Sequence, residues 1–173
     1  AFAWKAHERV ETPKGTIFPI ELTSQVWQGI TWKHQFVIYE PKNLETTDTV
    51  LLFITGGSTD SRRKPEDDLM AFRLAELTRA RVALLPQVPN QPLFGGKKED
   101  DLITETFLRY LESHDGSWPL LFPMVKSAVR AMDTVQSFVK NERAQEVKSF
   151  VVTGASKRGW TTWLTGASDG RVL

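Results

Sequence analysis

The spacing of apolar residues changes after the first third of the chain. Up to Thr55 the apolar residues form short runs or alternate with polar ones. Beyond Thr55, segments with strand-like spacing alternate with segments with helical spacing. An apolar run such as Thr49–Thr55 is typical of a strand buried on both faces of a parallel sheet. Pro19 predicts a sheet edge or a bulge, and Gly29 a hairpin turn. The predicted strands are Thr16–Leu22, Gln35–Tyr39, Thr49–Thr55, Arg81–Leu85 and Val147–Thr153.

Apolar residues three and four positions apart predict four helices between and after these strands. The clearest covers Met124–Lys140, and the others cover Glu99–Ser113, the segment that begins at Pro65, and Trp160–Leu164. Proline at a first helical position and carboxylates in a first turn both favour a helix start. The acidic triplets that follow Pro65 and begin at Glu99 are therefore interpreted as helix starts, not as metal ligands.

The resulting order is β-β-β-α-β-α-α-β-α, which indicates a parallel sheet with crossover helices behind an antiparallel leading hairpin. This combination predicts an α/β chain that forms the N-terminal part of an α/β-hydrolase fold. We expect a mostly parallel sheet with antiparallel leading strands and flanking helices. Residues 1–173 would then be a single domain, the N-terminal part of a larger α/β-hydrolase domain.

Composition narrows the choice of partners and cofactors. Lysine and arginine nearly balance aspartate and glutamate, for a net charge of +1, and the two signs are interleaved, which disfavours a nucleic-acid partner. The longest apolar run, Val50–Ile54, is too short to span a membrane. The absence of cysteine excludes disulfides and thiolate ligands, and no His/Asp/Glu cluster has metal-ligand spacing. We therefore expect neither a metal nor another cofactor. Six tryptophans are spread along the chain and are expected in the core.

Ser156 carries the strongest chemical signal. It follows the strand Val147–Thr153 and precedes a helix, the strand–turn–helix setting of a nucleophile elbow. Gly154 leaves room for the tight turn, and the backbone N–H of Lys157 is placed to stabilise an oxyanion at the helix N-terminus. Arg158 stands where the usual Gly-x-Ser-x-Gly pattern has its last glycine, and Gly159 follows it. The alternative is a plain glycine turn with Ser156 as a helix cap.

A second signal follows the strand Thr49–Thr55. In α/β-hydrolases the loop at this place supplies the other oxyanion donor, and here it contains Gly56, Gly57 and Ser58. Gly57 and Ser58 are the candidate donors, with a simple strand-ending turn as the alternative. The basic triplet that starts at Arg62 borders this loop; it is expected to be solvated, or else to meet an acidic substrate.

The base and acid of a catalytic triad do not follow Ser156. The order in α/β-hydrolases is Ser, Asp or Glu, then His, but only 17 residues come after Ser156 and none of them is histidine. We expect His7, His34 and His114, which all precede Ser156, to be structural or surface residues. Because a serine without a base is a weak nucleophile, the triad is either completed outside this chain or absent.

Several segments resemble the PhoPQ-activated pathogenicity-related protein family, whose members are α/β-hydrolase-like. The resemblance covers most of the chain and includes the Gly154–Trp163 elbow segment, so the Arg158 departure is the family's own pattern. The other segments are Leu22–Trp27, Trp32–His34, Val88–Leu93, Trp118–Lys126 and Ala131–Asp133. By this resemblance Ser156 is the nucleophile, Lys157 donates from its backbone, and the protein is exported, periplasmic or secreted, with a link to bacterial virulence and envelope stress.

The elbow also resembles that of glucuronoyl esterases, which place a cation directly after the serine. By that likeness the Lys157 side chain would add positive charge to the oxyanion hole. The resulting hypothesis is a serine hydrolase that acts on peptide or ester bonds, completed by the remaining C-terminal part of the same protein, present in the same or a separate chain. The alternatives are a catalytically silent binding or signalling protein on the same scaffold, and a structural half-domain.

Overall fold

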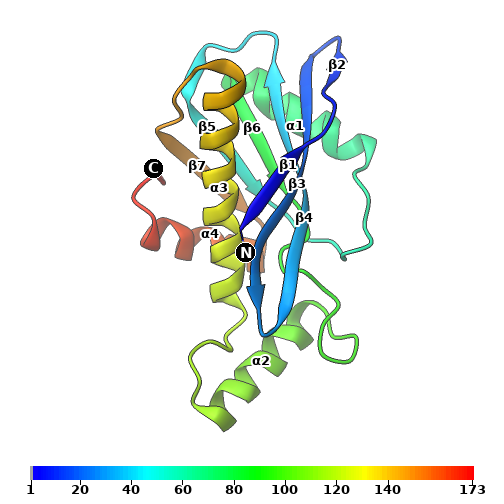
Figure 1. Ribbon diagram of the computed structural model, residues 1–173, viewed down its shortest axis with the longest axis vertical. Helices are drawn as coiled ribbons and strands as arrows, with labels where there is room; N and C mark the ends of the chain where they lie inside the picture. Colours follow the sequence, from blue (N-terminus) through cyan, green and yellow to red (C-terminus); the bar gives the residue numbers. More distant parts are fainter. Residues whose placement is uncertain (1) are drawn as a thin grey trace.

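Seven strands form one mixed sheet with helices on both faces (Figure 1). The computed structural model describes residues 2–173. The strand order is β1-β3-β4-β6-β5-β7, and β2 also pairs with β3. The strands are β1 Ala3–Ala6, β2 Val10–Thr12, β3 Gly15–Trp27, β4 Ile30–Pro41, β5 Thr46–Ile54, β6 Ala80–Leu85 and β7 Ser149–Gly154. The helices are α1 Pro65–Thr78, α2 Glu99–Ser113, α3 Leu121–Arg143 and α4 Lys157–Ser168.

The three strands β6, β5 and β7 are parallel, as their apolar runs predict. Leu52 in β5 lies opposite Ala83 in β6 and Val152 in β7. All six residues of β6 are buried, which explains why its sequence shows no alternation. Because β5 lies between β6 and β7, the carboxyl ends of all three strands meet at one edge of the sheet, where Gly56 and Ser156 follow their strands.

The leading strands are antiparallel, and β3 and β4 form a long hairpin that turns at Gln28 and Gly29. Both turn residues have positive φ (48° and 74°), which explains the glycine there. Pro19 lies inside β3 and not at a sheet edge or bulge; the bulge falls near Ser24. The Pro19 carbonyl accepts the His7 N–H (2.9 Å), so its missing N–H also faces the gap between β1 and β2. Proline therefore removes no bond between β3 and β4.

Strands β1 and β2 were not expected from the sequence. Most of their residues are exposed, so neither strand has the apolar alternation that marks a half-buried strand. Both pair antiparallel with β3, at Trp4–Leu22 and Val10–Ile17 respectively. Both strands pair with β3 through backbone hydrogen bonds, and in β1 Trp4 also packs edge-on against Phe138 of α3, with ring centroids 6.2 Å apart.

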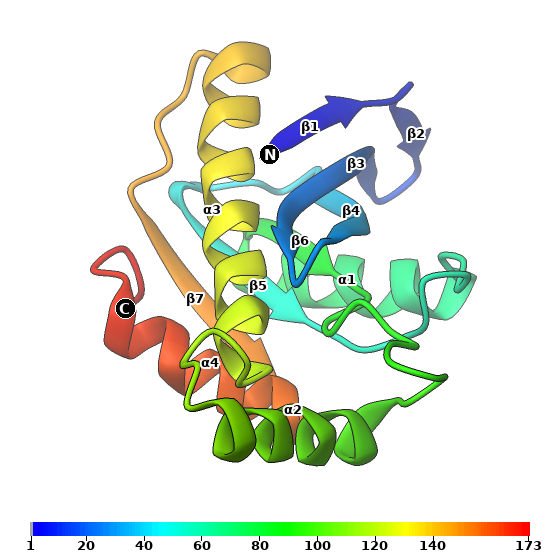
Figure 2. The ribbon, with the colours of Figure 1, turned by 60° about the horizontal axis from the view of Figure 1, so that its bottom comes forward.

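Each face of the sheet has its own apolar core. On one face α1 packs Phe72 against Tyr39 of β4, with ring centroids 5.3 Å apart. On the other face α3 covers the larger core with an almost continuous buried stripe that includes Met124 and Val135. Figure 2 shows α1 and α3 on opposite sides of the sheet, with α2 across its carboxyl end. This places the start of α2 near the loops that carry the predicted site.

The tryptophans divide between the core and the surface. Trp27 and Trp32 are buried, but Trp160 and Trp163 on α4 are 48% and 82% exposed, so the expectation of core positions is wrong for these two.

Strand β7 lies at the end of the sheet, where the Phe150 N–H donates to the carbonyl of Arg171 (2.8 Å). No helix within residues 2–173 is long and apolar enough to cross a bilayer.

Candidate active site

Ser156 occupies the sharp turn between β7 and α4. Its backbone dihedrals are φ 57° and ψ −125°, a conformation that costs a non-glycine residue about 1–3 kcal/mol. Its side chain is exposed and makes no capping hydrogen bond to α4, although Ser156 is the N-cap residue. The hydroxyl therefore does not serve as a helix cap, and the strain has the form of a nucleophile elbow.

The turn closes only because Gly154 lacks a side chain. A Cβ added to Gly154 would lie 2.8 Å from the backbone carbon and oxygen of Arg158, closer than such atoms approach in proteins. A Cβ on Gly159 would lie 3.1 Å from the Gly154 carbonyl oxygen. The two glycines thus let the first turn of α4 lie directly against the end of β7.

Lys157 is the first residue of α4, so its backbone N–H has no acceptor within the helix. This N–H adjoins the Ser156 hydroxyl along the chain and lies at the positive end of the helix dipole. This position is compatible with donation to a developing oxyanion, which stays a prediction.

The loop after β5 brings Gly56 and Gly57 to the same edge of the sheet. Gly57 has φ 111°, which glycine adopts without strain. The Ser58 N–H donates to the Ser61 hydroxyl oxygen at 2.9 Å. Since that bond engages the Ser58 amide, Gly57 is the better placed of the two predicted donors in this loop.

Arg158, at the position where the common motif has glycine, joins two loops and the start of α2. Its Nε donates to the Val88 carbonyl at 2.6 Å, and its side chain is only 10% exposed. A Cβ on Gly56 would lie 2.5 Å from its Nη2, so the guanidinium packs against the backbone of the predicted oxyanion loop. The same guanidinium forms two parallel bonds to Glu99, Nη1–Oε2 at 2.8 Å and Nη2–Oε1 at 2.7 Å.

Glu99 is the acidic centre of this cluster. Its Oε2 accepts Lys157 Nζ at 2.6 Å, and its Oε1 accepts Gln91 Nε2 at 2.6 Å. The hydrogen bonds from Arg158 act against the cost of burial, and with those from Lys157 and Gln91 they hold the pKa of the Glu99 carboxyl well below its usual range. The sequence identifies Glu99 as a helix start, but no sequence signal indicates its role as counterion to residues 58 and 59 positions away.

The Lys157 side chain is bound to two carboxylates, which does not fit the proposed role of its ammonium group in stabilising the oxyanion. Its Nζ is bound by Glu99 and, at 2.9 Å, by Asp100, and the side chain is 8% exposed. Burial opposes the ammonium form most strongly, but hydrogen bonds to the two carboxylates outweigh it and raise the Lys157 pKa. The hypothesis of an oxyanion-stabilising Lys157 ammonium is therefore not supported, whereas the backbone role is unaffected.

His34, the one buried histidine among the three expected to be structural or surface residues, does not serve Ser156. Its Nε2 bonds the Ser24 hydroxyl at 2.9 Å, and its Nδ1 bonds the Pro86 carbonyl at 2.9 Å. Burial lowers the pKa of His34 to about 4, against the effect of the Pro86 bond, so the ring is neutral at pH 7. Because Ser24 and His34 are 1% and 2% exposed, this Ser–His pair is structural.

The family model of the PhoPQ-activated pathogenicity-related proteins matches residues 1–173. The chain belongs to this family. It is also 35% identical over 184 residues to autocrine proliferation repressor protein A of Dictyostelium discoideum, covering 99% of the chain and 37% of that relative. The chain thus spans little more than a third of the length of this curated relative.

Solved structures with the same fold include esterases. The glucuronoyl esterase of Solibacter usitatus superposes with a TM-score of 0.62 at 14% identity, over 99% of this chain and 50% of that one. Acetyl xylan esterase 1 of a Thermoanaerobacterium species gives 0.60 at 16% identity, again over 99% and 50%. These likenesses confirm the α/β-hydrolase fold of the PhoPQ-related chain, with its antiparallel leading strands, parallel sheet and flanking helices.

Proposed function

We propose that the full-length protein is a serine hydrolase in which Ser156 attacks the carbonyl of an ester or peptide bond. The observation that carries this proposal is the strained, exposed and uncapped Ser156 between β7 and α4. Backbone strain of this kind persists only where the surroundings impose it, and it is concentrated at functional sites. The Gly154 contact and the Arg158 cluster supply that constraint.

In the proposed mechanism the Ser156 Oγ forms a bond to the substrate carbonyl carbon, and the carbonyl oxygen becomes an oxyanion. The N–H groups of Lys157 and Gly57 stabilise this charge, supported by the helix dipole of α4. A histidine oriented by an acid takes the serine proton and gives it to the leaving group. We assign this pair to the part of the full-length protein outside residues 1–173.

The esterase neighbours favour ester bonds as the first substrates to test. They share the fold at 14–16% identity, so they support a class of chemistry and not a particular substrate. Peptide bonds remain the second class, since acyl transfer at a serine serves both. We also propose that the protein is periplasmic or secreted and takes part in the bacterial response to envelope stress, a proposal that its family membership supports.

A second candidate function is a silent hydrolase scaffold that acts by binding. It is favoured by the curated relative, which is named as a repressor of proliferation and not as an enzyme. In that case the full-length protein would lack a histidine and an acid at Ser156. The strained turn would then have no chemical use.

The test is hydrolysis by the full-length protein of 4-nitrophenyl esters and of peptide 4-nitroanilides, beside Ser156→Ala. The proposal predicts ester turnover that Ser156→Ala reduces to the uncatalysed rate while the fold, followed by circular dichroism, is kept. A folded wild-type protein that hydrolyses neither class would support the binding function. Turnover that survives Ser156→Ala would assign the chemistry elsewhere.

A further inference from the structure

Two adjoining cavities extend from the predicted oxyanion loop along β4. One has a volume of about 290 Å³ and is lined by Gly56 and Gly57. The other has a volume of about 490 Å³ and reaches His7. They share five lining residues, namely Gln35, Val37, Arg62, Arg63 and Gln87. A ligand that reaches over the oxyanion loop, on the side away from β7, would therefore enter this space.

The walls of the two cavities are positively charged. The charged lining residues are four cations, Lys33, Arg62, Arg63 and Lys64, and two carboxylates, Glu21 and Asp67. This excess of two positive charges contrasts with a net charge of +1 for the entire chain. A cavity lined mainly by charges of one sign attracts a ligand of the opposite sign.

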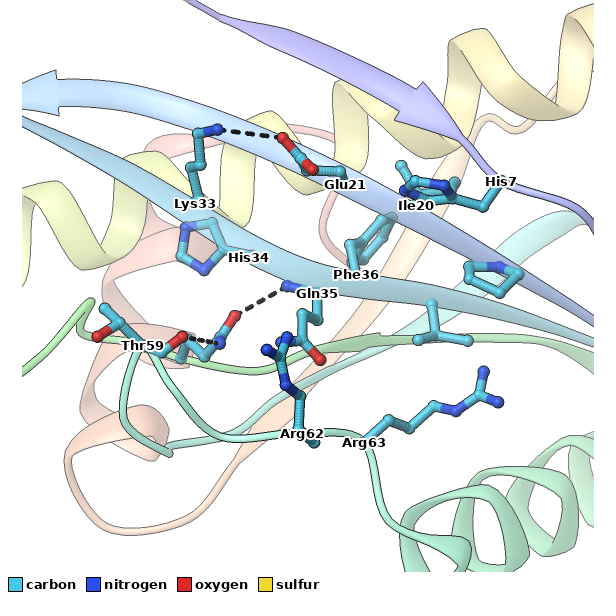
Figure 3. A pocket seen from close by; sticks show the side chains of 13 residues that line it. His7, Ile20, Glu21, Lys33, His34, Gln35, Phe36, Thr59, Arg62 and Arg63 are labelled. Carbon is cyan, nitrogen blue, oxygen red and sulfur yellow. Dashed lines mark hydrogen bonds and ion pairs between the residues drawn. The ribbon is translucent and has the colours of Figure 1, made fainter.

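Arg62 and Lys64 are the two cations of this group without an acidic partner among the described residues, and of these two only Arg62 lines both cavities. Lys33 pairs with Glu21 at 3.2 Å, and Arg63 pairs with Asp68 at 3.3 Å. Among the ion pairs formed by residues 2–173, none includes Arg62. Figure 3 shows its side chain rising from the loop toward Gln35 on β4, along the cavity wall. The guanidinium is thus available to a ligand in the cavity.

Two glutamines hold the segment that carries Arg62. Gln35 Nε2 donates to the Ser61 carbonyl at 2.9 Å, and Gln87 Nε2 donates to the Thr59 carbonyl at 3.2 Å. Gln87 Oε1 in turn accepts the Gln35 N–H at 2.8 Å. The backbone just before Arg62 is therefore fixed against β4, which lowers the entropy cost of presenting its guanidinium to a ligand.

We infer that this cavity binds an acidic group of the substrate, a carboxylate, through Arg62. The inference rests on the proposed function and gives its substrate a class: an ester that carries a negative charge beside the scissile bond. A guanidinium binds a carboxylate through two parallel hydrogen bonds, which a lysine cannot reproduce.

The experiment compares kcat/KM of the full-length protein for two matched pairs of esters. Mono-4-nitrophenyl glutarate, with its charge on the acyl side, is compared with 4-nitrophenyl valerate. For a charge on the alcohol side, 4-acetoxybenzoate is compared with its methyl ester. The inference predicts that the anion is preferred in at least one pair, that Arg62→Gln lowers this preference about tenfold, and that Arg62→Lys lowers it less. The preference also falls with added salt.

Arg73→Gln, on the exposed face of α1, is the matched control and leaves the preference unchanged. Arg62→Gln lowers kcat/KM more for the anionic ester of the preferred pair than for its neutral partner, and Arg73→Gln leaves the hydrolysis of neutral esters unchanged. No anion preference in either pair, or a preference that Arg62→Gln does not change, overturns the inference while the hydrolase stands. If the protein is inactive, calorimetric binding of glutarate decides: binding lost in Arg62→Gln supports the site alone, and no binding overturns it.

Discussion

The guanidinium of Arg158 and the carboxylate of Glu99 form a bidentate ion pair, with distances of 2.7 and 2.8 Å, directly behind the elbow that holds Ser156. Arg158 contributes from the first turn of α4 and Glu99 from the first turn of α2. The pair therefore joins α4, the helix that follows the nucleophile, to α2, which begins 58 positions earlier in the sequence. An arginine at this place, where many hydrolases have glycine, gains a structural role that glycine cannot supply.

Glu99→Gln is expected to lower the free energy of unfolding by about 1–2 kcal/mol. The change leaves Arg158 and Lys157 buried without their shared counterion, and the 42% exposure of the Glu99 side chain keeps the loss below that of a fully buried pair. Glu112→Gln, the same change at an exposed position of α2, is the control and should stay within about 0.5 kcal/mol. Chemical denaturation measures both, and equal effects would contradict the role of Glu99.

The stability that Glu99 contributes should depend on pH, and Glu99→Gln tests this dependence. Because the folded-state pKa of Glu99 is depressed, its contribution is complete above the unfolded-state pKa of about 4.3 and is lost as pH falls below it. The stability difference between wild type and Glu99→Gln should be constant from pH 7 to about pH 5 and shrink in more acidic solution. A difference that grows as the pH falls would contradict this assignment.

Gly154→Ala is expected to destabilise the protein by about 1–3 kcal/mol and to slow acylation of Ser156. The new methyl group meets backbone atoms of Arg158 at 2.8 Å, and backbone cannot move aside as a flexible side chain can. Gly116→Ala is the control, because a Cβ there has nothing within 4 Å. Thermal unfolding and the rate of fluorophosphonate labelling should both separate the two variants.

Ser156→Gly should unfold at a higher temperature than Ser156→Ala. Glycine adopts φ 57° and ψ −125° without the strain that alanine keeps, and about 1 kcal/mol of net stabilisation remains after its larger unfolded-state entropy. Neither variant has a nucleophile, so the comparison isolates backbone strain from chemistry. Equal melting temperatures would show that the turn is relaxed.

His34 should make the protein less stable in mild acid. Its pKa is lowered to about 4 by burial, so below pH 6.5 the unfolded state binds a proton that the folded state does not. Stability should fall by about 1.4 kcal/mol per pH unit from pH 6.5 to about 4. His34→Gln removes this contribution, and a variant with the unchanged pH slope would contradict the burial of a neutral ring.

The elbow and the sheet could be predicted from the sequence because their signals are local. The apolar run Thr49–Thr55 and the strand–turn–helix around Ser156 each indicate structure within a few residues. The ion pair of Arg158 with Glu99 could not be predicted, since a charged residue at a helix start has the same local pattern whether or not it has a distant partner. Nor could β1, whose four mostly exposed residues show no apolar alternation and whose partners, β3 and Phe138 of α3, are distant in the sequence.

The central claim is that Ser156 is an activated nucleophile, and covalent labelling tests it most directly. The full-length protein is treated with a fluorophosphonate probe beside Ser156→Ala, and the modified residue is located by mass spectrometry. The account predicts one labelled site, Ser156, with labelling absent in the variant and in denatured protein. A folded full-length protein that is not labelled, or is labelled at another residue, would contradict it.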